Sequence, residues 1–432
     1  MSSDRREFVK AAGMAAAATS FFPGRVLGAN DRMNAAFIGM GKMGRSNLAI
    51  ASRQENFQVV AVCDIFERNL NWAAEAARKK FPEVKAVKDF REILADKSID
   101  IVCISTPDHW HPYMTVEACK AGKDVYVEKP ICVTIDEGTK MVQAARKYKR
   151  VVQAGTMQRS GDHFQAAVKL VKDGEIGQVT RVQTWNVGLS PVIGQGAPAD
   201  SEPPAGLDWD MWLGPAPKRA FNENRFGVDP EDKNFSSFRW FWDYAGGMMT
   251  DWGIHLLDIV QMAFNETMPK SVSTFGEKFR LKDNRETPDT ILASYEYPEF
   301  IATYENRYGN ANTLTGHGYG ITFHGDKGTL FVDRAQYQLT PEGRGATTVT
   351  VKSGNNSNSA HWANFLDCVK TRKNPIADIE VCQRSTTTCL LANVSLRSKL
   401  RLDWDEAKWT TRQSEARKFL SREERKPWKL VV

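Results

Sequence analysis

The stretch Asn34-Ala35-Ala36-Phe37-Ile38-Gly39-Met40-Gly41-Lys42-Met43-Gly44 joins a short apolar run to a glycine-rich segment, and a helical pattern follows at residues 45–53. The order of strand, G-x-G-x-x-G and helix is typical of a turn that holds a pyrophosphate. Its glycines permit a tight turn and a close approach of the backbone, and the helix N-terminus attracts negative charge. The pattern predicts a dinucleotide site formed by Gly39, Met40, Gly41, Lys42, Met43 and Gly44.

A carboxylate follows the next apolar run. Asp64 directly follows the apolar run at residues 57–63 and lies twenty residues after Gly44. A carboxylate at this place accepts hydrogen bonds from the ribose next to adenine and repels the additional phosphate of NADP. We therefore expect NAD as the cofactor and favour NADP less, although Arg68 would soften that exclusion and leave dual use open. A role for Asp64 as a helix cap is compatible with this interpretation.

Further apolar strands, at residues 99–105, 124–127 and 150–152, alternate with helical patterns. Such alternation predicts a parallel, doubly wound α/β sheet of the Rossmann type, whose ligands bind beyond the carboxyl ends of the strands. The residues that follow those ends, or begin the next helix, are the expected further cofactor contacts: Thr106, Pro107, His111, Glu128, Lys129 and Gln158.

Three motifs together resemble one family. They are the glycine turn, Glu128-Lys129-Pro130, and Gly246-Gly247-Met248-Met249-Thr250-Asp251-Trp252-Gly253-Ile254-His255. With them the chain resembles the glucose–fructose oxidoreductases, inositol dehydrogenases and rhizopine-catabolism proteins, the Gfo/Idh/MocA family. The resemblance implies NAD(P)-dependent oxidation or reduction of sugars, cyclitols or their derivatives. It also implies that Lys129 lies near the reacting hydroxyl and that Asp251 binds or orients the sugar.

The residues themselves support a hydride-transfer site. Removing hydride from a carbinol carbon requires a group that takes the hydroxyl proton. Asp251 and His255 are four residues apart on a predicted helix and would face the same side. His255 is the expected general base, because an unperturbed imidazole has a pKa of about 6.5. Lys129 would hold the substrate oxygen or exchange its proton. The plainer alternatives are a packed histidine, a helix-capping aspartate and a solvated lysine.

No metal site is expected. His109 and His111 are one residue apart, and Asp251 and His255 have a spacing that some metal ligands share. The histidine pair has no accompanying cysteine or acidic ligand pattern. At the second pair a bound zinc is an alternative that the predicted chemistry does not need.

The alternating pattern ends near residue 159. From there the sequence predicts an α+β domain with an open, predominantly antiparallel sheet and helices on one face. We therefore expect an NAD(P)-binding domain at 31–158 and a substrate-binding and oligomerisation domain at 159–432. The resemblance implies a homodimer or homotetramer through this sheet. The expected strands are 179–185, 270–275, 290–297, 301–306, 319–323 and 328–332.

Two aromatic segments precede the third motif. Residues 188–227 form a long segment rich in proline and glycine, and Phe238-Arg239-Trp240-Phe241-Trp242-Asp243-Tyr244 follows. Long loops with aromatic side chains beside a catalytic element often form a substrate wall, although core packing is the leading alternative for any one ring. The expected substrate contacts, besides Asp251 and His255, are Arg159, Trp242 and Tyr244.

Composition narrows the classes of function. The chain has 432 residues, 42% of them hydrophobic, and a net charge of +6. This is the composition of a globular protein and gives no reason to expect nucleic acid or stable membrane insertion. The seven cysteines include no C-x-x-C pair and are expected to be free thiols.

The N-terminus has the features of an export signal. Arg5-Arg6, Phe8, the apolar run 11–22 and the small pair Gly28-Ala29 resemble a twin-arginine signal peptide at residues 1–29. The apolar run is shorter than the roughly 20 residues that span a bilayer. We therefore expect a periplasmic protein exported in the folded state with its cofactor. An ordinary amphipathic helix is the alternative.

The sequence leaves three functions open. The leading one is an NAD-dependent oxidoreductase that acts on a ring hydroxyl of a sugar, glycoside or cyclitol with a tightly bound, recycled cofactor. The second is an NAD-dependent, redox-neutral glycosidase, whose usual Tyr/His-Gly motif differs from residues 250–255 here. The third is a non-catalytic sugar or nucleotide sensor.

Overall fold

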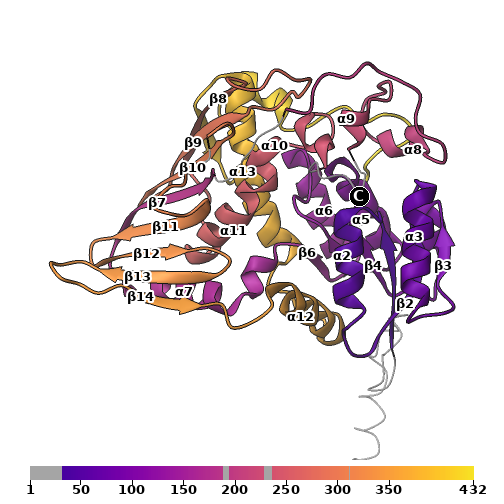
Figure 1. Cartoon of the computed structure of the whole chain (residues 1–432), viewed down its shortest axis with the longest axis horizontal. Coiled ribbons are helices and arrows are strands. Elements are labelled where there is room, and N and C mark those ends of the chain that lie inside the picture. Colours follow the sequence, from indigo (N-terminus) through magenta and orange to yellow (C-terminus); the bar gives the residue numbers. More distant parts are fainter. Residues whose placement is uncertain (1–31, 188–193, 228–235, 311) are drawn as a thin grey trace, which may run out of the picture. The chain divides into compact units, whose positions relative to one another are not determined.

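The computed structural model of the chain describes residues 32–187, 194–227, 236–310 and 312–432. From Met33 onward these residues build two sheets with helices packed against them (Figure 1). The predicted signal peptide at 1–29 lies outside the described residues, as do residues 188–193 of the expected substrate wall.

The first sheet is parallel and has the strand order β3-β2-β1-β4-β5-β6. Its central strands are mostly apolar because helices cover both faces. The predicted doubly wound sheet is therefore confirmed. Its strands are β1 (Met33–Ile38), β2 (Phe57–Cys63), β3 (Lys85–Val87), β4 (Ile101–Ile104), β5 (Asp124–Val127) and β6 (Val152–Ala154).

The helices between these strands follow the connections that the sequence predicts. The most clearly delimited is α6, which begins with a capping box between Thr134 and Glu137. The helices are α2 (Lys42–Ala51), α3 (Glu67–Arg78), α4 (Phe90–Ala95), α5 (His111–Lys120) and α6 (Ile135–Lys147).

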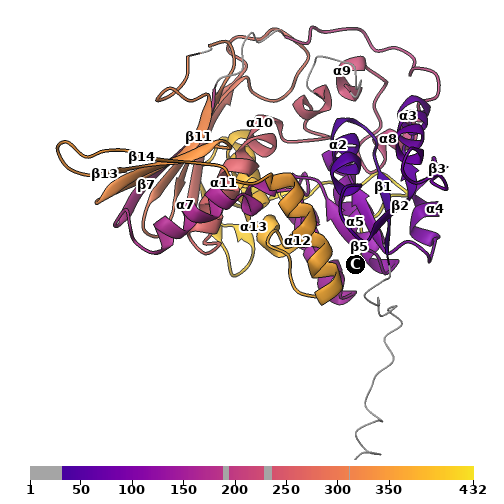
Figure 2. The same cartoon turned by 60° about the horizontal axis from the view of Figure 1, so that its bottom comes forward.

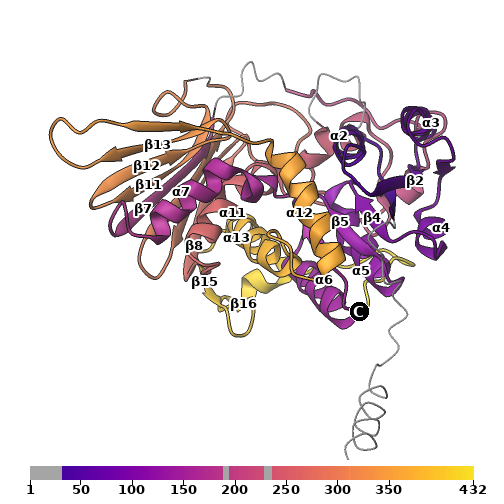
Figure 3. The same ribbon diagram turned by 90° about the horizontal axis from the view of Figure 1, so that it is seen from below.

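A helix from far downstream completes this layer. Helix α12 (Ser357–Thr371) packs beside α2, and its Trp362 stacks on Tyr126 of β5 with ring centroids 4.3 Å apart. The indole Nε1 donates a hydrogen bond of 3.2 Å to Oδ1 of Asn47 in α2. Helix α12, which the sequence assigns to the second predicted domain, therefore packs against the layer of the first sheet (Figure 3).

Trp362→Ala is expected to lower the free energy of unfolding by about 3–5 kcal/mol, because a large, fully buried ring is removed from a close-packed layer. The measurement is the shift of the urea unfolding midpoint. Phe279→Ala is the matched control, since 75% of Phe279 is exposed and the expected change is below about 0.5 kcal/mol. Equal midpoints for the two variants would contradict the assigned packing of α12.

The second sheet has ten strands in the order β14-β13-β12-β11-β7-β10-β9-β8-β15-β16. Only β7 and β10 pair in parallel among the described strands of this sheet, so the expectation of a predominantly antiparallel sheet is confirmed. The sequence missed the four short strands at its two edges, β13 to β16. The strands are β7 (Val179–Asn186), β8 (Ser271–Glu277), β9 (Thr290–Glu296), β10 (Ile301–Arg307), β11 (Tyr319–Gly325), β12 (Gly328–Val332), β13 (Gln336–Pro341), β14 (Val349–Lys352), β15 (Leu402–Asp405) and β16 (Thr410–Thr411).

Three helices cover one face of this sheet: α7 (Asp162–Lys172), α11 (Gly253–Ala263) and α13 (Ile379–Ser398), as Figures 2 and 3 show. The period-two pattern turns other apolar side chains outward. Phe275 and Leu292 lie opposite each other in the β8–β9 register and are 76% and 48% exposed. An apolar patch on the open face is compatible with the predicted homo-oligomer, which stays a prediction.

Short elements connect the two sheets. After η4 the chain returns to the first sheet, where Trp428 packs against Phe90, Trp110 and Tyr113. No helix in the described ranges is long and apolar enough to cross a membrane. The short elements are η1 (Asp108–Trp110), η2 (Met157–Ser160), α8 (Trp209–Leu213), α9 (Glu223–Phe226), η3 (Ser237–Trp240), α10 (Gly247–Asp251) and η4 (Ser414–Phe419).

Candidate active site

A cavity of about 280 Å³ lies at the carboxyl ends of the parallel strands. This is where ligands bind in doubly wound sheets. Its other wall comes from the second half of the chain. Its polar lining residues include Asp64, Thr106, Asp108, Glu128, Lys129, Arg239, Asp251, His255 and Arg334.

The glycine turn forms one end of the cavity. Gly39 has a φ of +85°, and a Cβ added there would lie 2.7 Å from the backbone nitrogen of Thr106. A Cβ at Gly44 would lie 1.9 Å from the carbonyl oxygen of Gly39. The turn and the first turn of α2 thus pack without room for side chains, which leaves a backbone cradle that fits a pyrophosphate. Gly39, Gly41, Lys42 and Met43 line the cavity, whereas Met40 and Gly44 do not.

Asp64 lies beside this turn at the end of β2. One carboxylate oxygen accepts a 2.6 Å hydrogen bond from the backbone nitrogen of Met40, and the other accepts one of 2.8 Å from that of Phe66. Burial raises the pKa of Asp64 to about 6. The side chain therefore fixes the turn and the start of α3 together, and it presents an acceptor to the cavity where the adenosine ribose of NAD would lie.

Glu128 and His111 line the cavity, but their polar atoms are directed mainly at the protein. Glu128 Oε1 accepts a 2.8 Å hydrogen bond from Asn47 Nδ2, and burial raises the pKa of its carboxyl. The ring nitrogens of His111 lie 2.7 and 2.8 Å from the carbonyl oxygens of Pro130 and Thr106. Both residues therefore hold the loops after β4 and β5 in place around the cavity.

The ammonium group of Lys129 is fixed by Asp251. Its Nζ donates hydrogen bonds of 2.7 Å to Asp251 Oδ1 and 3.0 Å to the Asp251 carbonyl oxygen. Arg239 Nε donates a third hydrogen bond of 2.8 Å to the same Oδ1. Burial alone would raise the pKa of Asp251, but the two cations outweigh it and hold that pKa well below its usual range. Asp251 is therefore a permanent anion that orients both cations.

His255 reaches the same cavity from the first turn of α11. Its Nδ1 is buried and has no hydrogen-bonding partner among the described residues. Burial, followed by the positive charges of Lys129 and Arg334, lowers the pKa of His255 well below its ordinary value. The sequence-based expectation of a near-neutral pKa is therefore corrected, and the imidazole is neutral at physiological pH.

The local backbone differs from the single helix that we expected. Asp251 ends α10, Trp252 lies at the junction, and Gly253 begins α11. Asp251 and His255 are therefore brought together by a helix–helix junction. The carboxylate faces Lys129, while the imidazole lies next to Trp252 with ring centroids 6.0 Å apart.

The lowered pKa of His255 predicts a particular pH profile. The general base that the sequence predicts at His255 would act in its deprotonated form, so the rate of the predicted hydride transfer should stay level from about pH 8 to about pH 6 and fall only at lower pH. Stopped-flow measurement of the holoenzyme with an accepted sugar would test this. Burial raises the pKa of Asp108 to about 7, so the profile is repeated in Asp108→Asn. An acidic limb near pH 6.5 that persists in this variant would contradict a neutral His255.

Three predicted substrate contacts do not line the cavity. Arg159 is 3% exposed and its guanidinium is engaged by Asp258 and Glu266. Trp242 lies under the guanidinium of Arg397, with 5.1 Å from its ring centroid to the arginine Cζ. The structure therefore corrects the predicted contacts at Arg159 and Trp242, because both side chains are committed to packing within the second domain.

Tyr244 is the third of these and is fully buried between Trp212 and His109, at centroid distances of 4.8 and 5.2 Å. It supports the aromatic wall from behind and does not reach the cavity. Gln158 is also outside the lining; its Nε2 donates a 2.9 Å hydrogen bond to the His255 carbonyl oxygen. It therefore positions His255 and makes no cofactor contact in this geometry.

Sequence reasoning missed several lining residues. Phe238 and Arg239 belong to the aromatic motif, but the bend at η3 directs these two into the cavity instead of Trp242. Asp108 lies between Pro107 and His109, and no motif in the sequence indicated that it lines the cavity. Arg334 follows β12 far along the chain, and nothing in its neighbouring sequence indicates a site.

Residues 194–227, which we call the crossing segment, bridge the second domain and the rim of the first sheet. Leu207 forms a β-bridge with Phe66, and the backbone nitrogen of Glu67 donates a 3.0 Å hydrogen bond to the Gly206 carbonyl oxygen. These contacts lie directly after Asp64, and Figure 1 shows α8 and α9 beside that part of the molecule. The crossing segment therefore covers the end of the cavity where the adenosine of a dinucleotide would lie.

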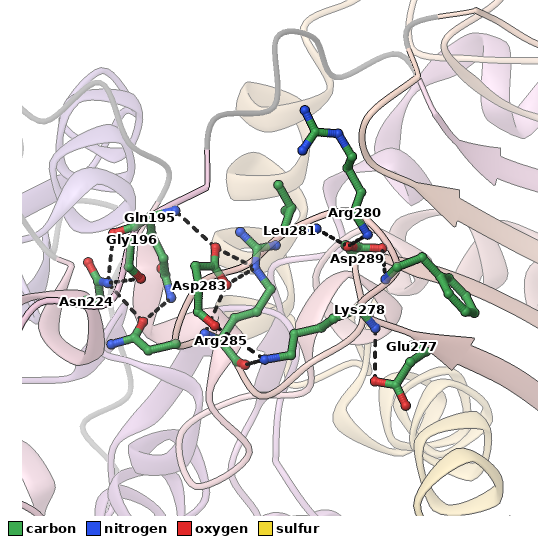
Figure 4. Close-up of polar contacts among 12 residues, drawn as sticks. Gln195, Gly196, Asn224, Glu277, Lys278, Arg280, Leu281, Asp283, Arg285 and Asp289 are labelled. Atoms are coloured by element: carbon green, nitrogen blue, oxygen red, sulfur yellow. Dashed lines mark hydrogen bonds and ion pairs between the residues drawn. The ribbon is translucent and has the colours of Figure 1, made fainter.

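A polar cluster anchors the start of this segment (Figure 4). Asp283 accepts hydrogen bonds of 3.0 Å from the backbone nitrogen of Gln195 and from Nε of Arg285. Asp289 accepts three from the successive backbone nitrogens of residues 279–281. The Arg285 guanidinium lies 4.7 Å from the ring centroid of Trp240. The cluster thus ties the crossing segment to η3 and so to Arg239.

The histidine pair is not placed as metal ligands would be. His109 Nε2 lies 2.9 Å from the Trp212 carbonyl oxygen, and burial lowers the pKa of His109 to about 3. Within the described ranges there is no group of three or more His, Cys, Asp or Glu side chains that could hold a metal ion. All seven cysteines of the chain are buried and free.

A parallel sheet with a glycine turn, a ribose-side carboxylate and a buried lysine–aspartate pair defines the class of NAD-binding oxidoreductases. Residues 33–156 match the model of the oxidoreductase family's NAD-binding Rossmann fold, and residues 165–430 match that of its C-terminal alpha/beta domain. The chain belongs to the Gfo/Idh/MocA oxidoreductase family. The predicted family, Rossmann domain and NAD-binding fold are thereby confirmed.

Individual relatives match parts of the sequence. Inositol 2-dehydrogenase of Salmonella paratyphi B is 32% identical over 163 residues, which cover 37% of this chain and 47% of that protein. A glycosyl hydrolase family 109 protein of Shewanella baltica is 28% identical over 202 residues, covering 40% of this chain and 44% of that protein. The chain thus spans about half the length of the curated relatives that it matches.

Solved structures match over most of the chain at low identity. A levoglucosan dehydrogenase in complex with NADH and levoglucosan has a TM-score of 0.64 and 17% identity, covering 86% of this chain and 99% of that one. An aldose–aldose oxidoreductase from Caulobacter crescentus complexed with glycerol has a TM-score of 0.65 and 20% identity over the same shares of the two chains. These likenesses show a common fold.

Proposed function

We propose that this protein oxidises a ring hydroxyl of a sugar, glycoside or cyclitol by hydride transfer to a tightly held, recycled NAD. The observation that carries the proposal is the convergence of Lys129, Asp251 and His255 on one cavity that also contains the glycine turn. The inositol and levoglucosan dehydrogenases among the similar proteins support the substrate class.

Lys129 would bind the reacting oxygen. An ammonium group has three N–H donors, and two of them are used on Asp251. The third remains for the substrate hydroxyl, and the positive charge stabilises negative charge that develops on this oxygen. Asp251 holds the ammonium in place and acts as a positioning residue.

His255 would take the hydroxyl proton. Its imidazole is neutral and lies beside Lys129 in the cavity, so a ring nitrogen is able to accept a proton. NAD, when bound, supplies the hydride acceptor. The protein's residues bind the substrate oxygen, remove its proton and exclude water.

The crossing segment supports the proposal of a retained cofactor. It hydrogen bonds to the rim of the first sheet at Glu67 and covers the adenosine end of the cavity. Release of a dinucleotide would require these contacts to open, which makes dissociation slow. A retained cofactor also suits the proposed folded export to the periplasm, which an Arg5→Lys, Arg6→Lys double variant would test by blocking export.

The test begins with the purified protein. Denaturation should release NAD or NADH, and addition of an accepted sugar to the NAD-loaded protein should produce the absorbance of reduced nicotinamide. A panel of sugars, cyclitols and aryl glycosides identifies the substrate. Two results would contradict the proposed function. One is that the protein binds no dinucleotide, and the other is that no member of the panel reduces the bound NAD.

A redox-neutral glycosidase is the second candidate, and the family 109 relative favours it. In that reaction the sugar is oxidised, the aglycone is eliminated, water is added and the sugar is reduced again. The same panel separates the two activities. Release of the aglycone without net change in reduced cofactor would select the glycosidase, whereas reduced cofactor with an intact glycoside selects the dehydrogenase.

A further inference from the structure

The side chain of Arg334 extends from a rigid turn into the catalytic cavity. The turn joins β12 to β13, and Asp333 Oδ1 fixes it by accepting hydrogen bonds from the backbone nitrogens of Ala335 and Gln336 at 2.8 and 3.0 Å. Arg334 lines the cavity together with His255. Its place is therefore set by the hairpin and not by a surface loop.

Two contacts orient the guanidinium. Nε donates a 3.1 Å hydrogen bond to Gln158 Oε1, and Gln158 Nε2 donates in turn to the His255 carbonyl oxygen. The guanidinium carbon lies 4.6 Å from the ring centroid of Trp252. The group is thus stacked on one side and held at Nε, which leaves the edge formed by its two Nη nitrogens.

This edge has no protein partner. Among the described residues, no hydrogen-bond acceptor contacts either Nη nitrogen, and no carboxylate forms an ion pair with Arg334. The other two cations of the cavity, Lys129 and Arg239, both share the single carboxylate of Asp251. Burial lowers the pKa of Arg334, as expected for a cation without a close anion.

A half-buried, unpaired guanidinium costs free energy, and a bound anion would offset this cost. A carboxylate matches the geometry, because its two oxygens can accept parallel hydrogen bonds from the two Nη nitrogens. It also matches the charge of this one group, since a single guanidinium balances a monoanion. A sugar phosphate carries about −1.5 to −2 at neutral pH, which is more negative charge than Arg334 alone balances.

We propose that Arg334 binds a carboxylate of the substrate, so that the molecule oxidised here is an acidic sugar, of the uronate or aldonate class. The proposal rests on the proposed function for the oxidation itself, but the binding of the acid does not depend on turnover. The carboxylate would lie against Arg334, and it would orient the ring so that one hydroxyl meets Lys129 and His255.

The experiment compares matched acid and neutral sugars on the NADH-loaded protein by isothermal titration. The paired probes are D-glucuronate against D-glucose, D-galacturonate against D-galactose, and D-mannuronate against D-mannose. Glucose 6-phosphate is titrated separately as a further probe. At least one acid should bind ten or more times as tightly as its neutral partner. Arg334→Gln should weaken the binding of that acid by about 10- to 100-fold and change the affinity for the neutral sugar by less than about threefold.

Two further variants serve as controls. Arg334→Lys keeps the charge but loses the paired donors, so it should recover only part of the affinity. Arg181→Gln removes the same charge from an exposed position on β7 and should change nothing. Retention of NADH by each variant shows that the protein has folded around its cofactor.

Three outcomes would overturn the inference: no acid binds better than its neutral partner, Arg334→Gln weakens both members of a pair equally, or glucose 6-phosphate binds best and depends on Arg334. These outcomes differ from failure of the proposed function, which would be retained NAD that no sugar, acidic or neutral, reduces.

Discussion

Lys129→Met should lower the rate of hydride transfer by about a hundred- to a thousandfold while the protein still retains NAD. The substitution keeps much of the volume of the side chain and removes the ammonium that we propose binds the reacting oxygen. It also leaves the buried carboxylate of Asp251 with Arg239 as its remaining cation, so the geometry around the substrate is loosened. Single-turnover reduction of bound NAD measures the effect on chemistry apart from cofactor exchange.

The control for this variant is Lys120→Met. Lys120 lies near the end of α5 and pairs with Glu117 at 2.8 Å, away from the cavity. Its substitution should leave the rate within about twofold of the parent protein. A Lys129→Met protein that retains NAD and reduces it within about fivefold of the parent rate would show that the ammonium has no part in the reaction.

The sequence predicted those parts of the site that lie in one short segment or at one edge of the sheet. The glycine turn is a local motif, and glycines at this spacing indicate the backbone geometry of the turn. Asp64 and Lys129 follow the ends of different strands, and the carboxyl ends of parallel strands meet at one edge. Their convergence on one cavity follows from the doubly wound topology alone.

Other parts depend on tertiary structure that no local pattern encodes. The aromatic motif correctly indicated a wall of the cavity, but the bend at η3 decides that Arg239 faces inward and Trp242 outward. Arg334 reaches the cavity from the turn of a hairpin, and the sequence of this turn gives no sign of a functional site. The pKa of His255 illustrates the same point, because burial and two neighbouring cations shift it from the value of a free side chain.

The return of α12 to the first sheet was hidden for the same reason. Its pattern is that of an ordinary buried helix, and nothing in it says which sheet it covers. The contacts of Trp362 with Tyr126 and Asn47 show that the helix supports α2, and Asn47 in turn holds Glu128. Glu128 is thus fixed, through Asn47, by a helix that the predicted boundary at residue 158 places in the second domain.

Gly44→Ala should abolish retention of the cofactor and weaken NAD binding by at least about a hundredfold. The added Cβ would lie 1.9 Å from the Gly39 carbonyl oxygen, which is backbone and has no side-chain freedom with which to move away. Either the turn or the first turn of α2 must shift, and the N–H groups that hold the pyrophosphate shift with it. The nicotinamide content of the purified protein and a titration with NAD measure the effect.

The matched substitution is Gly194→Ala, in the crossing segment, where an added Cβ would come no closer than 3.4 Å to any atom. This variant should bind NAD like the parent protein, because no backbone atom is displaced. Urea unfolding of both variants separates loss of the cradle from loss of the fold. If Gly44→Ala still carries a full complement of NAD, the pyrophosphate is not bound by this turn, and the place of Lys129 and His255 beside the nicotinamide must be reconsidered with it.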